Sequence, residues 1–371
     1  MNDKKIKVLL LSAPIGSGHR LAAEALQSAF AKYNNVEIVH GNVFDFFPAI
    51  LGKTFLKVYL WILGACPWLY EMMYKWGNKG EGSLWLRSLI NGALAYLGSS
   101  FIKRVAPDVV IATHATPAGI MSIYKRRNKS DLYLCGVITD FTVHRWWLCE
   151  GVDTYFIADE LLKEKFPKTQ ELVVTGIPLR EGFGKLAKEL CRKEFGWKEN
   201  EKVCLLMGGG EGLLPMEEII TALQNHKPEN LRLVALTGKN DSLAKSLMKK
   251  FAEVEVLGFT DKVPQLMCGA DIIISKAGGV SSAEILASNL DFIIYKPLPG
   301  QEENNAKFLA ANYGATIANN VANIKEEIAS LCKKVSKDNI NKKKIFGRPD
   351  ASHEVCEFVL ARLKNISPLD R

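Results

Sequence analysis

Residues 275–284 read Ser-Lys-Ala-Gly-Gly-Val-Ser-Ser-Ala-Glu, and they follow a short apolar run over 271–274. The apolar run is typical of a buried strand, and the residues after the glycines predict a helix over 282–288. The glycines therefore lie where a strand leads into a helix. Backbone N–H groups at a helix N-terminus are unpaired and carry the positive end of the helix dipole, so this junction suits a nucleotide diphosphate.

Polar side chains follow the junction at two places. Glu284 lies about one turn into the predicted helix, where its carboxylate can accept two hydrogen bonds from a ribose diol. A second apolar run, 291–295, is followed by a loop rich in proline and glycine and then by Gln301, Glu302 and Asn305. A glycine pair before a helix is equally consistent with a tight connection, but polar residues at successive strand ends indicate a ligand.

Two further glycine loops join a predicted strand to a predicted helix, at 16–18 and at 208–212. Neither loop matches the dinucleotide fingerprint with its later acidic residue, and the chain has no Gly-Lys-Ser/Thr phosphate loop, so a dehydrogenase or an ATPase fits poorly. Phe259 and Thr260 follow the strand predicted over 254–257. Phe259 is placed either to lie against a flat base or to be a core aromatic residue.

The first half of the chain places histidines after predicted strands. His19 lies at the start of a helix predicted over 21–33, where it is either a donor or base for a bound group or a helix cap. Asp140 and His144 follow a strand predicted over 132–139, and His114 ends a strand predicted over 109–114. His114 and His144 are also consistent with ordinary loop histidines. Strands and helices alternate throughout, which predicts doubly wound α/β domains.

The length of 371 residues exceeds the usual single core. We expect an N-terminal domain over 1–178, a C-terminal domain over 179–352, and a last helix within 353–371 that packs back toward the first domain. Proline and glycines after residue 175 mark the change of domain.

The stretch 44–103 is poor in charge and rich in aromatic residues, among them Trp61, Trp68 and Trp76, with lysines between them. Such a pattern suits the headgroup region of an anionic bilayer, and it suits equally a helical insertion that packs its aromatic rings into a core. The net charge of +8 favours an anionic partner, and no basic and aromatic nucleic-acid motif is present. Without a run of about eighteen apolar residues or a signal peptide, we expect a peripheral protein on the cytoplasmic side of the cell membrane.

These motifs resemble a known family. The pattern of 276–284 with 301–305 is similar to the nucleotide-sugar signature of the enzymes that add N-acetylglucosamine to lipid-linked murein precursors. The loop 16–20, the aromatic insertion and the segments 139–144 and 176–178 resemble the monogalactosyldiacylglycerol synthase and processive diacylglycerol glucosyltransferase family. The resemblance covers about 7–363 and implies the GT-B fold, in which two Rossmann-like doubly wound domains face a central cleft.

The resemblance also implies roles for individual residues. His19 takes the place of a general base, with Asp140 and His144 on the acceptor side and Gly18 beside the acceptor or membrane. Glu284 would bind the ribose hydroxyls, and Phe259 and Thr260 would flank the uracil. The remaining donor contacts fall into two groups: Gly209, Gly210, Lys276, Gly278, Gly279, Ser281 and Ser282 around the diphosphate, and Gln301, Glu302 and Asn305 around the sugar.

The implied function is inverting transfer of a hexose, glucose or galactose, from a UDP-sugar to diacylglycerol at the membrane surface. Since no Asp-x-Asp pair is placed to bind a metal, we expect no obligatory metal or other cofactor. Three alternatives stay open: a transferase for an isoprenoid-linked or other lipid acceptor, a non-catalytic regulator that binds UDP-sugar, and a UDP-sugar epimerase of the same fold. The epimerase leaves the aromatic insertion unexplained, and the presence of both His19 and Glu284 disfavours the regulator, which has no need of a base in the opposite domain.

Overall fold

The computed structural model describes residues 5–13, 17–42, 81–224, 228–333 and 347–365. Most of the predicted aromatic insertion lies outside the described residues, including Trp61, Trp68 and Trp76. The chain divides into two compact units, Met1–Arg180 together with Asp350–Arg371, and Glu181–Pro349. In the described part of each unit, the strands form one six-stranded sheet in which every pairing is parallel.

The central strands of the first unit's sheet are near-continuous apolar runs that are buried on both faces, as parallel sheets require, whereas its two edge strands are only partly buried. In sheet order its strands are β2 (Val36–Asn42), β1 (Ile6–Ser12), β3 (Val109–Ala112), β4 (Tyr133–Val137), β5 (Thr154–Ile157) and β6 (Glu171–Val174). The direction in which successive strands are added to the sheet reverses between β1 and β3: β2 lies on one side of β1, and β3 to β6 follow on the other side. In open α/β sheets, ligands bind at the carboxyl edge beside such a reversal.

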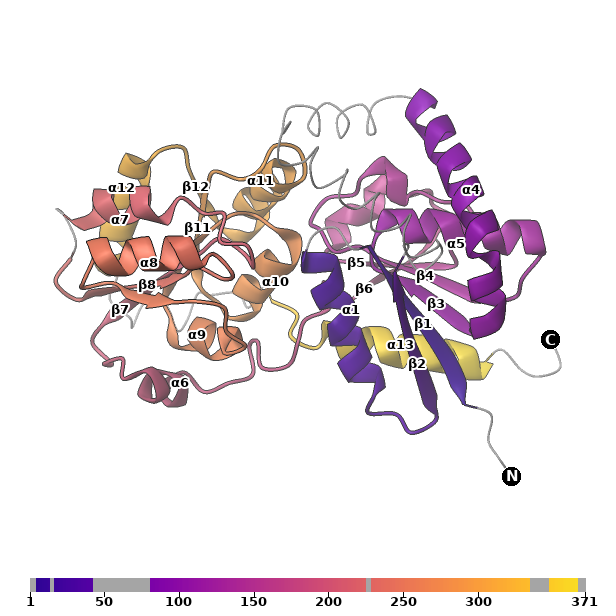
Figure 1. Ribbon diagram of the computed structural model, residues 1–371, viewed down its shortest axis with the longest axis horizontal. Helices are drawn as coiled ribbons and strands as arrows, with labels where there is room; N and C mark the ends of the chain where they lie inside the picture. Colours follow the sequence, from indigo (N-terminus) through magenta and orange to yellow (C-terminus); the bar gives the residue numbers. More distant parts are fainter. Residues whose placement is uncertain (1–4, 14–16, 43–80, 225–227, 334–346, 366–371) are drawn as a thin grey trace. The chain divides into compact units, whose positions relative to one another are not determined.

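Helices cover both faces of this sheet. Crossovers between parallel strands are right-handed, and β1 leads to β2 in one direction while β3 leads to β4 in the other, so α1 (Ser17–Phe30) and α5 (Ala115–Asn128) lie on opposite faces. Helix α4 (Glu81–Val105) contacts α5, and the C-terminal helix α13 (Ala351–Asn365) contacts α1 (Figure 1). Val355, Val359 and Leu363 of α13 are part of the core between α1 and the sheet.

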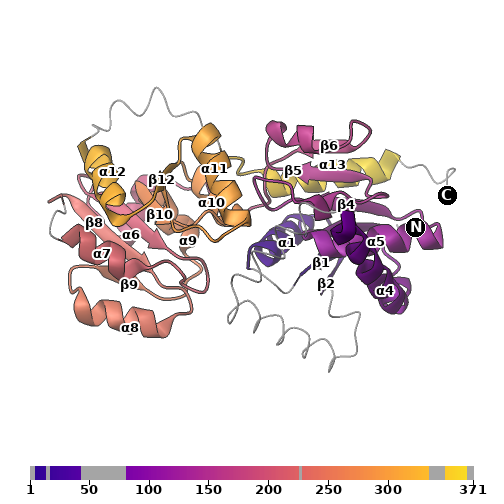
Figure 2. The same ribbon diagram turned by 90° about the horizontal axis from the view of Figure 1, so that it is seen from above.

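The second unit repeats this plan. In sheet order its strands are β12 (Thr316–Ala318), β11 (Asp291–Tyr295), β10 (Ile272–Ser275), β7 (Lys202–Met207), β8 (Leu231–Leu236) and β9 (Glu255–Leu257). The crossover rule places α7 (Met216–Gln224) and α8 (Asp241–Lys250) on one face, where α12 (Val321–Lys333) contacts α7. It places α9 (Val263–Gly269), α10 (Gly279–Ala287) and α11 (Gln301–Tyr313) on the other face, where α6 (Lys188–Phe195) contacts α9 (Figure 2).

Element boundaries differ from the sequence prediction at the junctions. Helix α10 begins at Gly279 rather than at 282, and α1 begins at Ser17 rather than at 21. Strands β3 and β4 end at Ala112 and Val137, earlier than predicted. Apolar periodicity identifies the buried face of an element, but it gives no signal for a first helical turn that consists of small or polar residues. The loops before α1 and α10 are therefore shorter than predicted, whereas loop residues begin earlier than predicted after β3 and β4.

Within the described residues, no helix is both long enough and apolar enough to cross a membrane.

Candidate active site

The carboxyl edge of the first sheet brings three distant segments together around His19. His19 lies in the first turn of α1, directly after β1, and Thr113 and Thr139 follow β3 and β4. The Nδ1 atom of His19 lies 2.9 Å from the carbonyl oxygen of Thr113 and 2.7 Å from Oγ1 of Thr139. Because β1, β3 and β4 are consecutive neighbours in the sheet, their ends meet at this point.

These contacts determine the tautomer of His19. A carbonyl oxygen can only accept, so Nδ1 must carry the hydrogen, which Thr113 and Thr139 share. The other ring nitrogen, Nε2, then holds the lone pair. Burial lowers the pKa of His19 to about 4, an effect that the hydrogen bond to Thr113 opposes. At neutral pH, His19 is therefore a neutral, oriented imidazole whose Nε2 can accept a proton.

Two neighbouring histidines have the opposite tautomer. The backbone N–H of Thr116 donates to Nδ1 of His114 at 3.1 Å, and that of Trp146 donates to Nδ1 of His144 at 3.2 Å. Each ring caps a helix, α5 and the 3₁₀ helix η2 (Arg145–Trp147), and each presents a protonated Nε2 when neutral. The rings of His114 and His19 meet edge to face with centroids 4.6 Å apart.

The pKa of His114 lies well below the ordinary histidine value. Burial is the main cause, and the nearby rings of His19 and His144 lower the pKa further. His114 therefore stays neutral and keeps its Nε2–H at physiological pH. The first unit thus places one proton acceptor beside the neutral N–H donor of His114, an arrangement suited to binding and deprotonating a hydroxyl group.

The other predicted residues of this unit lie near the same edge. Asp140 follows β4 directly after Thr139, and its side chain is buried. Gly18 precedes His19 in the first turn of α1 and is partly buried. The structure thus brings Gly18, His19 and Asp140 to one edge of the sheet, and it adds His114, which the sequence left between a site residue and a loop histidine.

The carboxyl edge of the second sheet is built from two glycine loops. Gly212 has a φ of +62°, and a Cβ there would lie 2.2 Å from the carbonyl oxygen of Thr237, a distance that no side chain tolerates. The backbone N–H of Lys239 donates to the carbonyl of Gly210 at 2.9 Å. The loop after β7 is thereby held against the loop after β8.

Gly209 and Gly210 face open space. A Cβ built on either residue would have no atom within 4 Å, and Gly209 has a φ of +73°. Gly278, the N-cap of α10, is similarly open, because a Cβ there would meet only Glu302, at 3.9 Å. A ligand can therefore approach the backbone at these positions more closely than side chains would allow.

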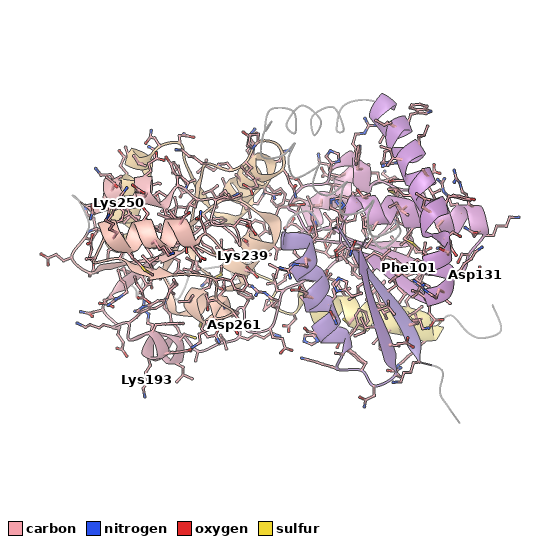
Figure 3. All side chains as sticks on the ribbon, in the orientation of Figure 1. Phe101, Asp131, Lys193, Lys239, Lys250 and Asp261 are labelled. Atoms are coloured by element: carbon pink, nitrogen blue, oxygen red, sulfur yellow. The ribbon has the colours of Figure 1, made fainter. Side chains whose placement is uncertain are left out.

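Phe259 is not a core residue. Its ring is 68% exposed, and Nζ of Lys239 lies 5.8 Å from the ring centroid. Lys239, labelled in Figure 3, extends from the loop after β8, and Phe259 follows β9. An exposed aromatic ring and a cation beside the glycine loops suit a flat base and a phosphate. The sequence reasoning did not single out Lys239, although its position directly after Gly238 at a strand end was a usable signal.

The starts of α10 and α11 are joined by side chains. Nζ of Lys276 lies 3.3 Å from Oε1 of Glu302, and the other oxygen of Glu302 accepts from the backbone N–H of Leu298 at 2.7 Å. The amide of Asn305 donates to the carbonyl of Ala277 at 3.1 Å. The charge of Lys276 is therefore already paired with Glu302, and Asn305 braces the loop before α10.

The remaining predicted donor residues differ in exposure. Ser281 is partly exposed in the first turn of α10, whereas Ser282 is fully buried and its Oγ has no hydrogen-bond partner among the described residues. Glu284 is 3% exposed. Gln301 and Thr260 are partly exposed, and Oγ1 of Thr260 accepts from the backbone N–H of Lys262. The structure thus places all the predicted donor residues around the carboxyl edge of one sheet.

Comparison with known proteins adds the family. Residues 19–179 match the model described as monogalactosyldiacylglycerol (MGDG) synthase, and residues 203–360 match the glycosyltransferase family 28 C-terminal domain. A processive diacylglycerol beta-glucosyltransferase of Bacillus pumilus (strain SAFR-032) is 30% identical over 346 residues, which are 89% of this chain and 88% of the relative. The chain belongs to this glycosyltransferase family.

A second member of the family, from Bacillus subtilis (strain 168), carries the same name and is 29% identical over 345 residues, 89% of this chain and 88% of the relative. Among solved structures, MurG of Acinetobacter baumannii aligns with a TM-score of 0.62 at 15% identity, covering 96% of this chain and 99% of MurG. The two Rossmann-like units are thus the GT-B fold, which confirms the predicted fold class. The chain is a glycosyltransferase, as predicted.

Proposed function

We propose that this glycosyltransferase transfers a hexose, glucose or galactose, from a UDP-sugar to the free hydroxyl group of diacylglycerol, with inversion at the anomeric carbon. The observation that carries the proposal is His19, whose Nδ1–H is shared by Thr113 and Thr139 so that Nε2 is left as a base. The name of its relatives, processive diacylglycerol beta-glucosyltransferase, supports the acceptor and favours glucose.

In the proposed reaction, Nε2 of His19 accepts the proton of the acceptor hydroxyl. The oxygen forms a bond to the anomeric carbon, and the bond from that carbon to the UDP oxygen breaks, so that UDP leaves with the electron pair. The open backbone at Gly209, Gly210 and Gly278 supports a diphosphate here, and Lys239 is a cation close to the same loops. We expect no obligatory metal, since these groups stabilise the leaving charge.

The donor's other parts have matching candidates. Phe259, exposed beside Lys239, would stack on the uracil, and Glu284 would accept from the ribose hydroxyls. Gln301 and Glu302, at the start of α11, would bind the sugar hydroxyls. Because Glu302 is paired with Lys276 in the structure, the sugar would meet a carboxylate that is already oriented.

The deciding experiment measures label transfer from UDP-glucose and, separately, from UDP-galactose to diacylglycerol in mixed vesicles with EDTA present. Labelled glycolipid supports the proposal, identifies the sugar and excludes an obligatory divalent metal. The anomeric configuration of the product, determined by NMR, tests inversion. If UDP binds but no glycolipid forms, the acceptor is an isoprenoid-linked or other lipid, or the protein is a regulator without turnover.

Action at a membrane surface is part of the proposal, and helix α4 supports it. Trp85, Leu89 and Tyr96 are 68%, 55% and 80% exposed on this helix, an unusual amount of apolar area to leave in water. Replacing Trp85 and Leu89 together by serine is expected to lower the partition of the protein into vesicles about tenfold. Flotation measures this, and an unchanged partition would remove α4 from the membrane contact.

The low pKa of His19 predicts the pH dependence of the reaction. Neutral imidazole accepts a proton and imidazolium cannot, so activity should be lost as pH falls through the pKa. Since kcat/KM reports the free protein, it should stay level from roughly pH 8 to pH 5 and fall with a midpoint near 4. Initial rates at low donor concentration measure this, with brief acid exposure and return to pH 7 as the control for unfolding. A midpoint near 6.5 would contradict the buried base.

A further inference from the structure

The first unit has a cavity between α4 and α5 that the proposed reaction does not use. It is a shallow cavity, open to solvent, with a volume of about 320 Å³, and it is lined by Ser88, Ile123, Arg126 and Arg127. This volume is at the lower end of the range for small-ligand pockets. Two arginines and one hydroxyl make up most of the lining, so the chemistry of the cavity favours a phosphate-like anion.

The charges around the cavity are unequally paired. Nζ of Lys125 lies within 2.6 Å of Oδ1 of Asp153, and Arg126 pairs with the carboxylate of Glu150. Among the described residues, Arg127 has no such partner: its Nη1 donates to the backbone carbonyl of Gly92 at 3.2 Å. Counted over the described residues, the lining of the cavity therefore keeps a net positive charge.

Gly92 gives Arg127 its position. A Cβ at Gly92 would lie 3.0 Å from Nη2 of Arg127, closer than nine in ten real contacts of a Cβ. The guanidinium thus packs directly on the backbone of α4, one turn after Ser88. A guanidinium held in this way presents its remaining N–H groups in a fixed direction, which is how arginine binds phosphate with geometric selectivity.

The cavity adjoins the exposed apolar strip of α4. With about 100° of rotation per residue, Trp85, Tyr96 and Leu89 fall within about 40° of one another around the helix, and Gly92 borders them on the side of Ser88. All three are more than half exposed. One side of α4 thus passes from a basic cavity to a lipophilic strip, which matches the order of headgroup and acyl chains in a phospholipid.

We propose that this cavity binds the phosphate of an anionic phospholipid headgroup, with the acyl chains lying along Trp85, Leu89 and Tyr96. The inference rests on the membrane part of the proposed function and adds a defined lipid site to it. The apolar strip favours a lipid over a free phosphate as the source of the anion, because a soluble phosphate would leave the strip exposed.

Flotation with vesicles of phosphatidylcholine, with or without about one third phosphatidylglycerol, tests the site. Arg127→Gln is expected to reduce binding to the anionic vesicles about fivefold and to leave binding to neutral vesicles unchanged. Lys165→Gln removes one exposed positive charge from the same unit and serves as the control, with less than a twofold effect. Equal effects of the two variants would overturn the site.

Gly92→Ala keeps the proposal testable without removing a charge. Alanine favours the helix, so α4 stays folded, but its Cβ would lie 3.0 Å from Nη2 of Arg127, so the guanidinium must shift by a few tenths of an ångström. Binding to anionic vesicles should fall, but by less than in Arg127→Gln, because the charge is kept. Calorimetric titration with inorganic phosphate and with glycerol 3-phosphate tests the other source of the anion. If either of these soluble anions binds as tightly as the vesicles do, and if that binding is lost in Arg127→Gln, the lipid assignment is overturned.

These measurements need neither donor nor acceptor. If the proposed reaction is wrong, no glycolipid forms in detergent micelles without anionic lipid, while the protein still binds vesicles. If the lipid site is wrong, Arg127→Gln floats with anionic vesicles as the wild type does, while glycolipid synthesis is intact.

Discussion

Replacing His19 by alanine is expected to lower kcat by about 10²- to 10⁴-fold, the range lost when a positioned general base is removed. The reason is geometric: Nδ1–H is held by Thr113 and Thr139, so Nε2 is the nitrogen left to accept the acceptor's proton. The affinity for UDP should be unchanged, because UDP would bind at the second unit. Single-turnover transfer of labelled sugar measures kcat, and calorimetric titration measures UDP binding.

Two variants serve as controls for the His19 result. His353→Ala removes a histidine of α13 that contacts Lys32, away from the edge that holds His19, and should leave kcat unchanged. Thr139→Val keeps the base but removes one of the two acceptors of its Nδ1–H, so kcat should fall by less than in His19→Ala. Near-full turnover of His19→Ala with normal UDP binding would remove His19 from the mechanism.

Replacing Glu284 by alanine is expected to weaken UDP binding about 10- to 100-fold, as the loss of hydrogen bonds to a charged group implies. The carboxylate is 3% exposed near the start of α10, where a ribose diol would be desolvated as it binds. Glu284→Gln keeps the shape and one acceptor oxygen, so its affinity should lie between those of the wild type and the alanine variant. Calorimetry measures all three, and thermal unfolding monitors the fold.

A ligand lacking the ribose hydroxyls makes this test specific. In the wild type, 2′,3′-dideoxy-UDP should bind about as weakly as UDP binds to Glu284→Ala. In Glu284→Ala, the two ligands should bind equally, because the group that distinguished them is gone. If the variant still prefers UDP by the full wild-type factor, Glu284 does not bind the ribose.

Much of the fold could be predicted from the sequence because its signals are local. Apolar runs such as 271–274, glycine loops and the alternation of strands with helices identify doubly wound units without knowledge of distant contacts. Helix starts were less predictable: the first turn of α10, Gly279 to Ser281, contains no apolar periodicity. The unpaired N–H groups at the start of α10 therefore lie earlier in the chain than predicted, next to Gly278, whose backbone a ligand can approach.

The site was predictable as a set of positions but not as a set of contacts. His19, Thr113 and Thr139 are far apart in the chain, and their meeting depends on the register of β1 with β3 and of β3 with β4. The pairing of Lys276 with Glu302 likewise depends on where α11 begins. The place of Lys239 at a strand end could be read from the sequence, but its position over Phe259 depends on the pairing of β8 with β9.

The return of α13 to the first unit has a consequence for biosynthesis. The second unit is a continuous segment, Glu181–Pro349, whereas the first unit needs residues from both ends of the chain. Val355, Val359 and Leu363 complete its core, and Oγ of Ser352 donates to the carbonyl of Leu179. On the ribosome, the unit that is made second can therefore finish folding first, while the nascent N-terminal half waits with an open hydrophobic face until the α13 residues emerge from the exit tunnel.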